Sequence, residues 1–392
     1  MKVVSCVLPI GPYHPALKEG ELFKLIVDGE EVVDAEIKVG YNHRGIEKLA
    51  ESMTYDQVVY LVERICGICS NIHPLCFVQV IEDIAGIEVP DRARYIRTII
   101  AELERVHSHL LWLGVLGHIV GFDTLLMWSW KIREPILDIF EEITGNRRHY
   151  AINVIGGVKW DISPEAAPKI LSVVRDARKS LNRLLDIATR DSTTLARLRN
   201  VGVLSKHDAK KFCVVGPTAR GSGLHIDTRK DHPYAAYKEI SFDVPTVNDG
   251  DVWARTYVRI LEMIESLSIV EQALGALPSG PIKADRKEIP PWQEGTRVCE
   301  APRGEDLHFV ITGENNRPWR LKVRSPSVVN VPSLTKMLPG YTVADSVAII
   351  GSIDPCFSCT DRVAIVKEDG GVKEFYSFDE LIKMCRRKYG GV

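Results

Sequence analysis

Two Cys-x-x-Cys pairs near opposite ends of the chain constrain its fold more than any other feature of the sequence. Cys66-Gly67-Ile68-Cys69 lies in the first fifth of the 392 residues, and Cys356-Phe357-Ser358-Cys359 lies in the last tenth. Thiolates bind soft and borderline metals, and two matched pairs supply the four ligands of one centre. A centre that uses all four requires a fold that brings both ends of the chain together.

The spacing alone leaves the kind of centre open. One Cys-x-x-Cys pair is also typical of a redox pair, and two are typical of structural zinc. Structural zinc usually joins short loops in domains that lack a core, whereas most of a long chain separates these pairs. A site that joins distant elements favours catalysis, with nickel, iron or zinc as the metal. The other cysteines show no pairing and are expected to be core residues or inert thiols: Cys6, Cys76, Cys213, Cys299 and Cys385.

The composition predicts a large globular protein with an extensive core. With 50 basic and 52 acidic side chains the net charge is -2, which gives no reason to expect nucleic acid as a partner. Nine cysteines are too few for a disulfide scaffold, and residues 1–15 lack the pattern of a signal peptide. We therefore expect a reducing, cytoplasmic environment.

Strand patterns occur at both ends of the chain. Apolar alternation in residues 22–27 and 32–39, around the turn Asp28-Gly29-Glu30, predicts an N-terminal β-hairpin. Residues 307–312 and 319–323 show a second pair of strands around a polar turn.

Helical periodicity occupies the middle of the chain. It begins after Thr54, and apolar residues recur every three or four positions between Tyr95 and Leu110. Ser163-Pro164-Glu165 predicts the start of a second long helix, and a third follows Asp249. The expected fold is therefore α+β, mainly α, with a central bundle of long helices.

This pattern divides the chain into four expected regions. Residues 1–50 form an N-terminal β region, and residues 51–290 form the helical bundle with the first cysteine pair. Residues 291–362 form a small C-terminal β region with the second pair. Residues 363–392 form a final strand, turn and helix.

The stretch from Leu110 to Trp130 comes closest to a membrane span, because His118 and Asp123 are its only ionisable residues. An aspartate in the middle of a bilayer is costly, so a buried helix is the better interpretation. We also expect a break in this helix, because the stretch contains three glycines: Gly114, Gly117 and Gly121.

Three stretches resemble the signatures of nickel-iron hydrogenase large subunits. They are residues 64–69 followed by His73, the sequence Glu-Ala-Pro-Arg-Gly at 300–304, and residues 354–362. The likeness is closest to the energy-converting, membrane-bound branch of the family, which is related to the quinone-module large subunit of respiratory complex I. Four further stretches carry this likeness: Gly11 to Pro15, His43 to Glu47, Glu104 to His109 and Gly216 to Gly223.

The resemblance implies a nickel-iron centre on the four cysteines. Cys66 and Cys356 would bind nickel alone, whereas Cys69 and Cys359 would bridge nickel and iron. The iron of such centres carries carbon monoxide and two cyanides. Cys356 would act as the base that takes a proton when dihydrogen is split.

The resemblance also assigns roles to three residues around this centre. Arg303 falls where the family places an arginine over the diatomic ligands, although most arginines are simply solvated. His73 matches a histidine that hydrogen-bonds a bridging sulfur. Glu19 aligns with the family's first proton relay beyond the nickel thiolate, with Glu21 as a close competitor.

Glu47 resembles a carboxylate that binds a structural magnesium in some relatives. Those relatives end with histidine where this chain has Arg362. A maturation protease cuts many relatives at that point after nickel insertion. Residues 363–392 are therefore either a cleavable extension or a tail that this branch keeps.

The implied function is that of the catalytic large subunit of an energy-converting hydrogenase, which reduces protons to dihydrogen reversibly. The sequence has no cluster motif beyond the two pairs, so ferredoxin electrons would arrive through a small iron-sulfur subunit. Membrane ion-pumping subunits would complete the assembly. The chain would be a peripheral subunit at the cytoplasmic face of the cell membrane, without a transmembrane helix of its own.

Two other classes of function remain open from the sequence. A metal-free relative of the complex I subunit, or a sulfur-reducing one, would use the same scaffold, although it has no chemical need for four thiolates. A structural zinc protein that acts as an interaction module is the third hypothesis.

Two other motifs are weaker. Glu104-x-x-His107 has the spacing of a di-iron ligand pair, but the matched helices that such a centre needs are absent. The glycine-rich stretch 216–223 lacks the lysine and hydroxyl residue of a phosphate loop, so close packing explains it better.

Overall fold

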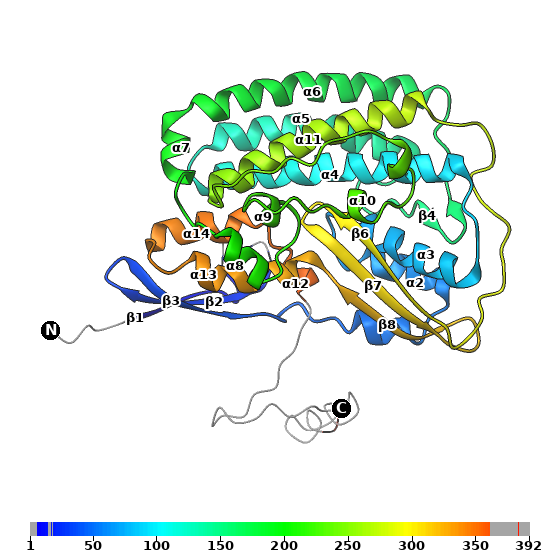
Figure 1. Ribbon diagram of the computed structural model, residues 1–392, viewed down its shortest axis with the longest axis horizontal. Coiled ribbons are helices and arrows are strands. Elements are labelled where there is room, and N and C mark those ends of the chain that lie inside the picture. The colour runs from blue at the N-terminus through cyan, green and yellow to red at the C-terminus, as the bar shows by residue number, and fades with distance from the viewer. Residues whose placement is uncertain (1–5, 15–16, 18, 361–382, 384–392) are drawn as a thin grey trace.

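A layer of four long helices covers two small sheets and several shorter helices (Figure 1). The computed structural model describes residues 6–14, 17, 19–360 and 383. The long helices are α4 (Asp91–Ile119), α5 (Asp123–Thr144), α6 (Ala166–Arg190) and α11 (Val252–Gly275). The predicted α+β fold, mainly α with a central bundle, is confirmed.

Two antiparallel sheets lie on the same side of the bundle. The N-terminal sheet has the order β1-β2-β3, with strands Cys6–Ile10, Leu22–Asp28 and Glu31–Lys38. The second has the order β6-β7-β8, with strands Glu294–Ala301, Gly304–Thr312 and Pro318–Arg324. Both predicted strand pairs are present, and β1 adds a third strand to the N-terminal hairpin.

Shorter elements connect these layers. The short helices before α11 are α1 (Ile46–Ala50), α2 (Tyr55–Glu63), α3 (Ile72–Ala85), α7 (Ser192–Leu198), α8 (Lys206–Lys211), α9 (Gly216–Arg220), α10 (Thr228–Asp231) and η1 (Tyr237–Glu239). Those after β8 are α12 (Pro326–Asn330), η2 (Val331–Ser333), α13 (Leu334–Met337), α14 (Val343–Ser352) and η3 (Phe357–Cys359), and the two-residue strands β4 (Asn153–Val154) and β5 (Gly157–Val158) pair after α5.

Local sequence explains where the main helices begin. Thr54 caps α2 in a capping box with Gln57, and Asp251 caps α11 by accepting from Ala254 N. The helix predicted from Ser163 begins at Ala166, although Ser163 Oγ still accepts from Ala166 N at 3.2 Å.

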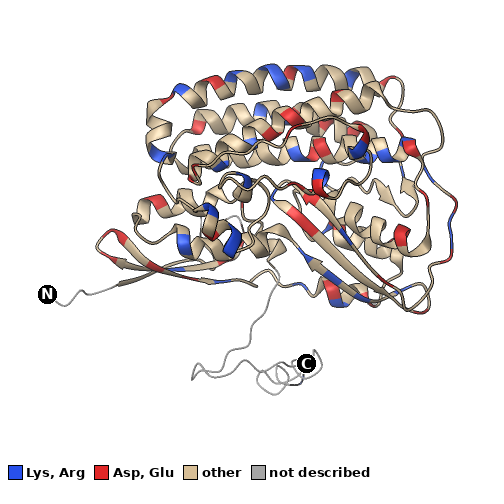
Figure 2. Ribbon diagram, viewed as in Figure 1, with Lys and Arg blue, Asp and Glu red and all other residues tan. Residues whose placement is uncertain are grey.

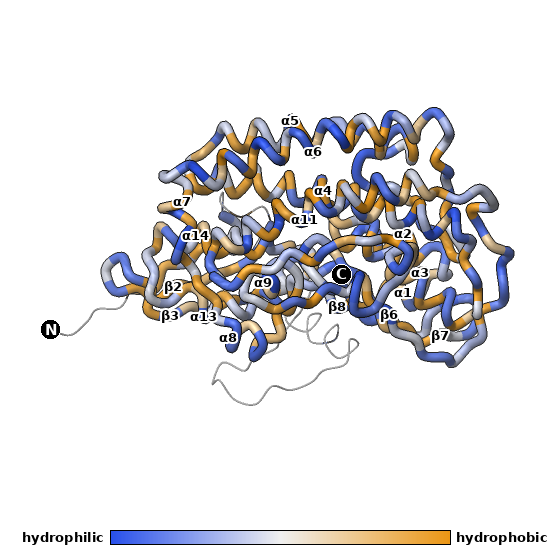
Figure 3. Tube along the Cα trace, turned by 45° about the horizontal axis from the view of Figure 1, so that its top comes forward, coloured by the Kyte–Doolittle hydropathy of each residue, from blue (hydrophilic) through white to orange (hydrophobic). Residues whose placement is uncertain are grey.

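Amphipathic faces place the helices in the bundle. In α6 the buried residues recur every three or four positions, and Figure 3 shows hydrophobic and hydrophilic residues alternating along this helix. Lys, Arg, Asp and Glu are interspersed along it (Figure 2).

The helix break expected within residues 110–130 is present, between the end of α4 at Ile119 and the start of α5 at Asp123. Helix α4 continues through Gly114 and Gly117 and ends before Gly121, which has φ +84°. A Cβ at Gly114 would lie 3.0 Å from Trp130, and one at Gly117 would lie 2.9 Å from Leu125. These glycines therefore let α5 pack closely against α4.

No helix among the described residues is both long and apolar enough to cross a membrane. The predicted final strand, turn and helix, and Arg362, lie outside the residues that the structure describes, apart from Lys383.

Candidate metal centre

The two cysteine pairs meet beneath the helical bundle. Cys356 Sγ lies 3.4 Å from Cys66 Sγ and 2.7 Å from Cys359 Sγ. The sulfurs of Cys66, Cys356 and Cys359 lie within 4.8 Å of one another, and Cys69, Cys359 and His73 form a second such group. Each of the four cysteines is at least 94% buried. The fold thus gathers four thiols from both ends of the chain in one buried place.

The first pair lies on the turn between α2 and α3. Cys66 Sγ accepts the backbone N–H groups of Ile68 and Cys69, at 3.4 and 3.3 Å. From α4, His107 Nε2 contacts Ile68 O at 3.2 Å, and Glu104 Oε1 accepts from Asn71 N at 2.6 Å. Glu104 and His107 therefore hold the turn that carries the first pair.

The second pair follows α14 and is held by the start of α12. Ser327 Oγ accepts Cys356 N at 3.0 Å, and Ser325 Oγ donates to Cys359 O at 2.6 Å. Asp354, just before the pair, has φ +52°, in the left-handed region.

Arg44 joins the two cysteine segments. Its guanidinium donates to Arg64 O at 2.7 Å and Ile65 O at 2.9 Å, just before the first pair. It also donates to Ser358 O, within the second pair, at 3.2 Å. One side chain from the stretch 43–47 therefore fixes both segments relative to each other.

The thiols favour one negative charge among them. The thiols of Cys356 and Cys359 donate hydrogen bonds to Cys66, which places the Cys66 pKa well below its ordinary value. Hydrogen bonds with Cys356 and then with Cys66 place the pKa of Cys359 well above its ordinary value. Four adjacent thiolates repel one another unless a cation lies among them.

The donor set fits a soft transition metal. Four sulfurs converge, they are shielded from water, and a guanidinium lies beside them. Hard cations such as magnesium prefer oxygen ligands. Cys66, Cys69, Cys356 and Cys359 are thus the residues that would hold such a metal.

Arg303 is fixed beside the sulfurs. It lies on the turn between β6 and β7 and is 3% exposed. Its Nε donates to Asp354 O at 2.6 Å and its Nη2 donates to Asp354 Oδ1 at 2.9 Å, while Nη1 lies 4.0 Å from Cys69 Sγ. Burial lowers the pKa of a guanidinium, but Asp354 and the thiols raise the pKa of Arg303 above its ordinary value. It is therefore a buried, permanently charged donor and not a surface arginine.

Two glycines let the chain pack against the Arg303 turn. A Cβ at Gly216 would lie 2.4 Å from Arg303 O, and one at Gly304 would lie 2.6 Å from Gly216 N. Asn330 Nδ2 also donates to Arg303 O, at 3.2 Å. The glycine-rich stretch thus serves close packing, as the sequence indicated.

His73 lies in the first turn of α3, between the sulfurs and two further polar side chains. Its Nε2 is 4.0 Å from Cys359 Sγ, and its Nδ1 is 3.0 Å from Asp306 Oδ2. His308 Nε2 reaches the same oxygen at 3.2 Å. Sequence reasoning missed Asp306 and His308 as a pair, although residues two apart on a strand share a face.

Glu19 and Glu21 bind opposite ends of the segment 358–360. Glu19 Oε2 accepts Ser358 N at 2.7 Å, and its Oε1 accepts the Ser358 hydroxyl. Glu21 is fully buried, and its Oε2 lies 3.0 Å from Thr360 Oγ1. The family resemblance assigned the proton-relay role to Glu19, but the sequence could not show that Glu21 contacts the same segment.

The Glu47 carboxylate accepts hydrogen bonds from strand β8. Its two carboxylate oxygens accept from Lys322 Nζ at 2.8 Å and Val323 N at 3.0 Å. These contacts neutralise its charge, so the structure gives no support to a magnesium site on Glu47.

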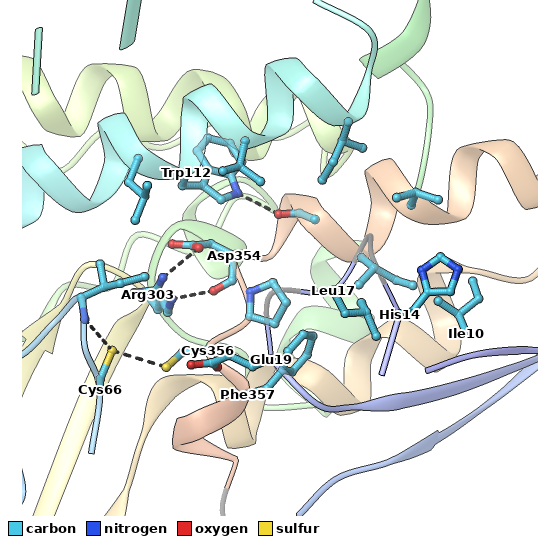
Figure 4. A pocket seen from close by; sticks show the side chains of 18 of the residues that line it. Ile10, His14, Leu17, Glu19, Cys66, Trp112, Arg303, Asp354, Cys356 and Phe357 are labelled. Atoms are coloured by element: carbon cyan, nitrogen blue, oxygen red, sulfur yellow. Dashed lines mark hydrogen bonds and ion pairs between the residues drawn. The ribbon is translucent and has the colours of Figure 1, made fainter. Parts of the chain in front are cut away.

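A cavity of about 500 Å³ extends from the sulfurs between β1, α4 and α14. Figure 4 shows Cys66, Cys356, Arg303 and Glu19 at one end, and Ile10 and His14 at the other. Between them the lining is mostly apolar: Leu17, Leu111, Trp112, Val115, Ile119, Val343, Val347 and Ile350. Small apolar molecules therefore have a route to Cys356.

Family comparisons cover most of the chain. The sequence model described as "Respiratory-chain NADH dehydrogenase, 49 Kd subunit" matches residues 120–296 and 288–362. The one described as "Nickel-dependent hydrogenase" matches residues 44–122, which include the first cysteine pair.

Individual proteins match over similar lengths. The chain is 43% identical to the "Membrane-bound hydrogenase subunit alpha" of Pyrococcus furiosus, covering 97% of this chain and 92% of that protein. It is 38% identical to a protein of the NADH-quinone oxidoreductase of Chloroherpeton thalassium, covering 91% and 88%. A chain of the solved archaeal membrane-bound sulfane sulfur reductase superposes with a TM-score of 0.87 at 32% identity, covering 91% of this chain and 98% of that chain.

Proposed function

Because the chain belongs to the oxidoreductase family that contains membrane-bound hydrogenase large subunits and the 49 kDa subunit of respiratory NADH dehydrogenase, we propose that it is the catalytic large subunit of a nickel-iron hydrogenase. The observation that carries this proposal is the convergence of Cys66, Cys69, Cys356 and Cys359 in one buried cluster. When bound there, a nickel-iron centre supplies the site at which dihydrogen is formed or split. Carbon monoxide and cyanide on the iron are part of this proposal.

The surrounding side chains have distinct tasks in this reaction. Cys356 Sγ holds a proton, because it faces both the other sulfurs and the cavity. Glu19 lines the same cavity and passes that proton to or from Cys356. Arg303, held by two bonds to Asp354, keeps a positive charge and N–H donors beside Cys69. His73 places an N–H or a lone pair near Cys359.

The partners follow from the chemistry and from the relatives. The described residues contain no further group of cysteines that could hold an iron-sulfur cluster, so electrons from ferredoxin would pass through a small iron-sulfur subunit. Relatives are named as membrane-bound, which supports membrane ion-pumping subunits as further partners and a place at the cytoplasmic face of the membrane. If residues 363–392 are a cleavable extension, a maturation protease would remove them.

A metal-free reductase of quinone or sulfur is the second candidate. The apolar cavity that ends at Glu19 favours it, because an apolar substrate of that kind needs such a chamber. A metal-free reductase, however, would not use the four clustered thiols, whereas hydrogenase chemistry uses all of them.

Metal loading tests the proposal. We expect the complex purified from its own cells to contain nickel and iron, to show infrared bands of bound carbon monoxide and cyanide, and to evolve dihydrogen from reduced viologen. Cys356→Ser and Cys66→Ser should each abolish nickel binding and activity, since serine is a poor ligand for a soft metal.

Cys213→Ser is the matched control, because Cys213 is an exposed thiol. It should retain nickel and activity. Zinc in place of nickel, or full quinone or sulfur reduction by the two serine variants, would contradict the proposal.

A further inference from the structure

Glu21 is a buried carboxyl group that the hydrogenase chemistry described so far does not use. Its exposed fraction is 0%, although it lies only two residues from Glu19. The segment between them is fixed, because Asn42 Nδ2 donates to Gly20 O at 2.8 Å and Glu21 N donates to Pro12 O at 3.1 Å. A buried carboxyl group in a rigid segment has to be either protonated or paired.

The hydrogen bonds at Thr360 show which form Glu21 takes. The Thr360 hydroxyl carries one hydrogen, and it lies 2.7 Å from Phe357 O and 3.0 Å from Glu21 Oε2. The carbonyl of Phe357 can only accept, whereas a carboxyl group can accept or donate, so both contacts are satisfied when the hydroxyl hydrogen goes to that carbonyl. The shorter of the two distances agrees with this assignment. The contact with Glu21 is then a hydrogen bond only if Glu21 donates, which requires a proton on Oε2.

The electrostatic surroundings agree with a protonated Glu21. Burial, and to a smaller extent the charge of Glu19, raise the pKa of Glu21 to about 8. Glu19 is the titratable group that acts on it, and Thr360 is the polar side chain that faces it from the C-terminal segment. The other oxygen, Oε1, has no hydrogen-bond partner among the described residues.

The position of Glu21 connects it to the metal centre. Glu19 binds Ser358 and Glu21 binds Thr360, so the two carboxyl groups flank Cys359 along one short segment. Glu19 in turn shares the cavity with Cys356. Glu21 does not line this cavity, so Glu19 is the carboxyl group of the two that faces Cys356.

We propose that Glu21 is a proton reservoir that recharges Glu19 during dihydrogen formation. This inference rests on the proposed hydrogenase function. In the step, the O–H bond of Glu21 breaks, an O–H bond forms on the Glu19 carboxylate, and Glu21 is left as a carboxylate. A hydronium ion from the solvent then gives a proton to Glu21 and becomes water. No electron moves in this step.

The first test is an infrared pH titration of the metal-free full-length chain. The wild type should show carbonyl absorption of protonated carboxylic acids at pH 7, with one band, that of Glu21, which disappears as the pH is raised through about 8. Glu21→Gln, which can still donate to Thr360, should lack this band. Glu36→Gln should keep it, because Glu36 is an exposed residue paired with Lys24.

The second test uses the complete complex. Glu21→Gln should lower the rate of dihydrogen evolution at least tenfold and raise its solvent deuterium isotope effect, with unchanged nickel content. Glu21→Asp, which keeps the acid, should recover part of the rate. A structural hydrogen bond alone would leave Glu21→Gln at the wild-type rate.

The two tests separate this inference from the function on which it rests. A titrating band that persists in Glu21→Gln, or a Glu21→Gln complex as fast as Glu36→Gln, would overturn the inference. If even the wild-type complex evolves no dihydrogen, the hydrogenase proposal fails and the role of Glu21 falls with it, whereas the infrared titration still reports whether Glu21 holds a proton.

Discussion

A carboxyl group that keeps its proton inside the folded chain makes stability depend on pH. The pKa of Glu21 is raised to about 8 in the fold, above the ordinary value of 4.5. The folded state therefore binds the proton more tightly than the unfolded state does, and this contribution is fully present below about pH 4.5. It is lost as the pH rises from there through about 8.

Melting of the metal-free chain at pH 6 and pH 9 measures this contribution. The wild type should lose more stability over this interval than Glu21→Gln, which has no proton to release. Glu21→Gln should therefore be the more stable of the two at pH 9. Parallel pH profiles for the two proteins would show that Glu21 is ionised in the fold throughout.

Single residues of the site differ in how far the sequence could predict them. The four cysteines and Arg303 were predictable, because their spacing and motif are local in sequence. The proton on Glu21 was not, since it depends on the hydroxyl of Thr360, 339 residues away. Likewise, the contact of Asp306 with His73 depends on how β7 packs against α3.

At the scale of elements, the approach of α9 to the turn between β6 and β7 decides where Arg303 lies. Gly216→Ala would place a Cβ 2.4 Å from Arg303 O at a position with φ +65°. Gly86→Ala has nearly the same backbone strain, at φ +60°, with no atom within 4 Å of the new Cβ. A comparison of these two variants therefore separates the effect of the steric clash from the effect of the left-handed backbone conformation.

Gly86→Ala should cost about 1 kcal/mol in free energy of unfolding, the usual cost of alanine in the left-handed region. Gly216→Ala should cost more and should also lower nickel retention, because the Arg303 turn has to move. Denaturant unfolding and nickel analysis measure the two effects. Equal costs and equal nickel content in the two variants would refute the packing role of Gly216.

Sequence patterns predicted individual helices and strands well. The hairpin around Gly29, the start of α2 at the Thr54 cap and the β7–β8 pair follow from local periodicity and capping. The helix break expected within residues 110–130 lies at Gly121, but periodicity does not reveal that α5 packs against Gly114 and Gly117.

For the whole molecule, a buried network of charges holds the long helices to the segment that follows α9. Arg220, with 0% side-chain exposure, pairs with Glu262 of α11 at 2.6 Å and Glu300 of β6 at 2.9 Å. Asp227 lies 3.3 Å from the same guanidinium. Sequence reasoning could not find this network, since each charge has its partners in a different element.

Removing one partner of such a network leaves buried charges uncompensated. Arg220→Met should lower the free energy of unfolding by about 3–5 kcal/mol. Arg175→Met is the control, because Arg175 is an exposed partner of Glu271, and it should cost less than about 1 kcal/mol. Similar denaturant midpoints for the two variants would contradict this expectation.

The separation of 290 positions between Cys66 and Cys356 also determines when the two cysteine pairs are synthesised. At about 5–20 residues per second, the second pair leaves the ribosome between about 15 and 60 s after the first. Throughout that interval the nascent polypeptide presents only half of its sulfur ligands, and Arg44 still lacks the Ser358 carbonyl. Metal delivery to the complete set of four sulfurs therefore has to wait until the second pair has been synthesised.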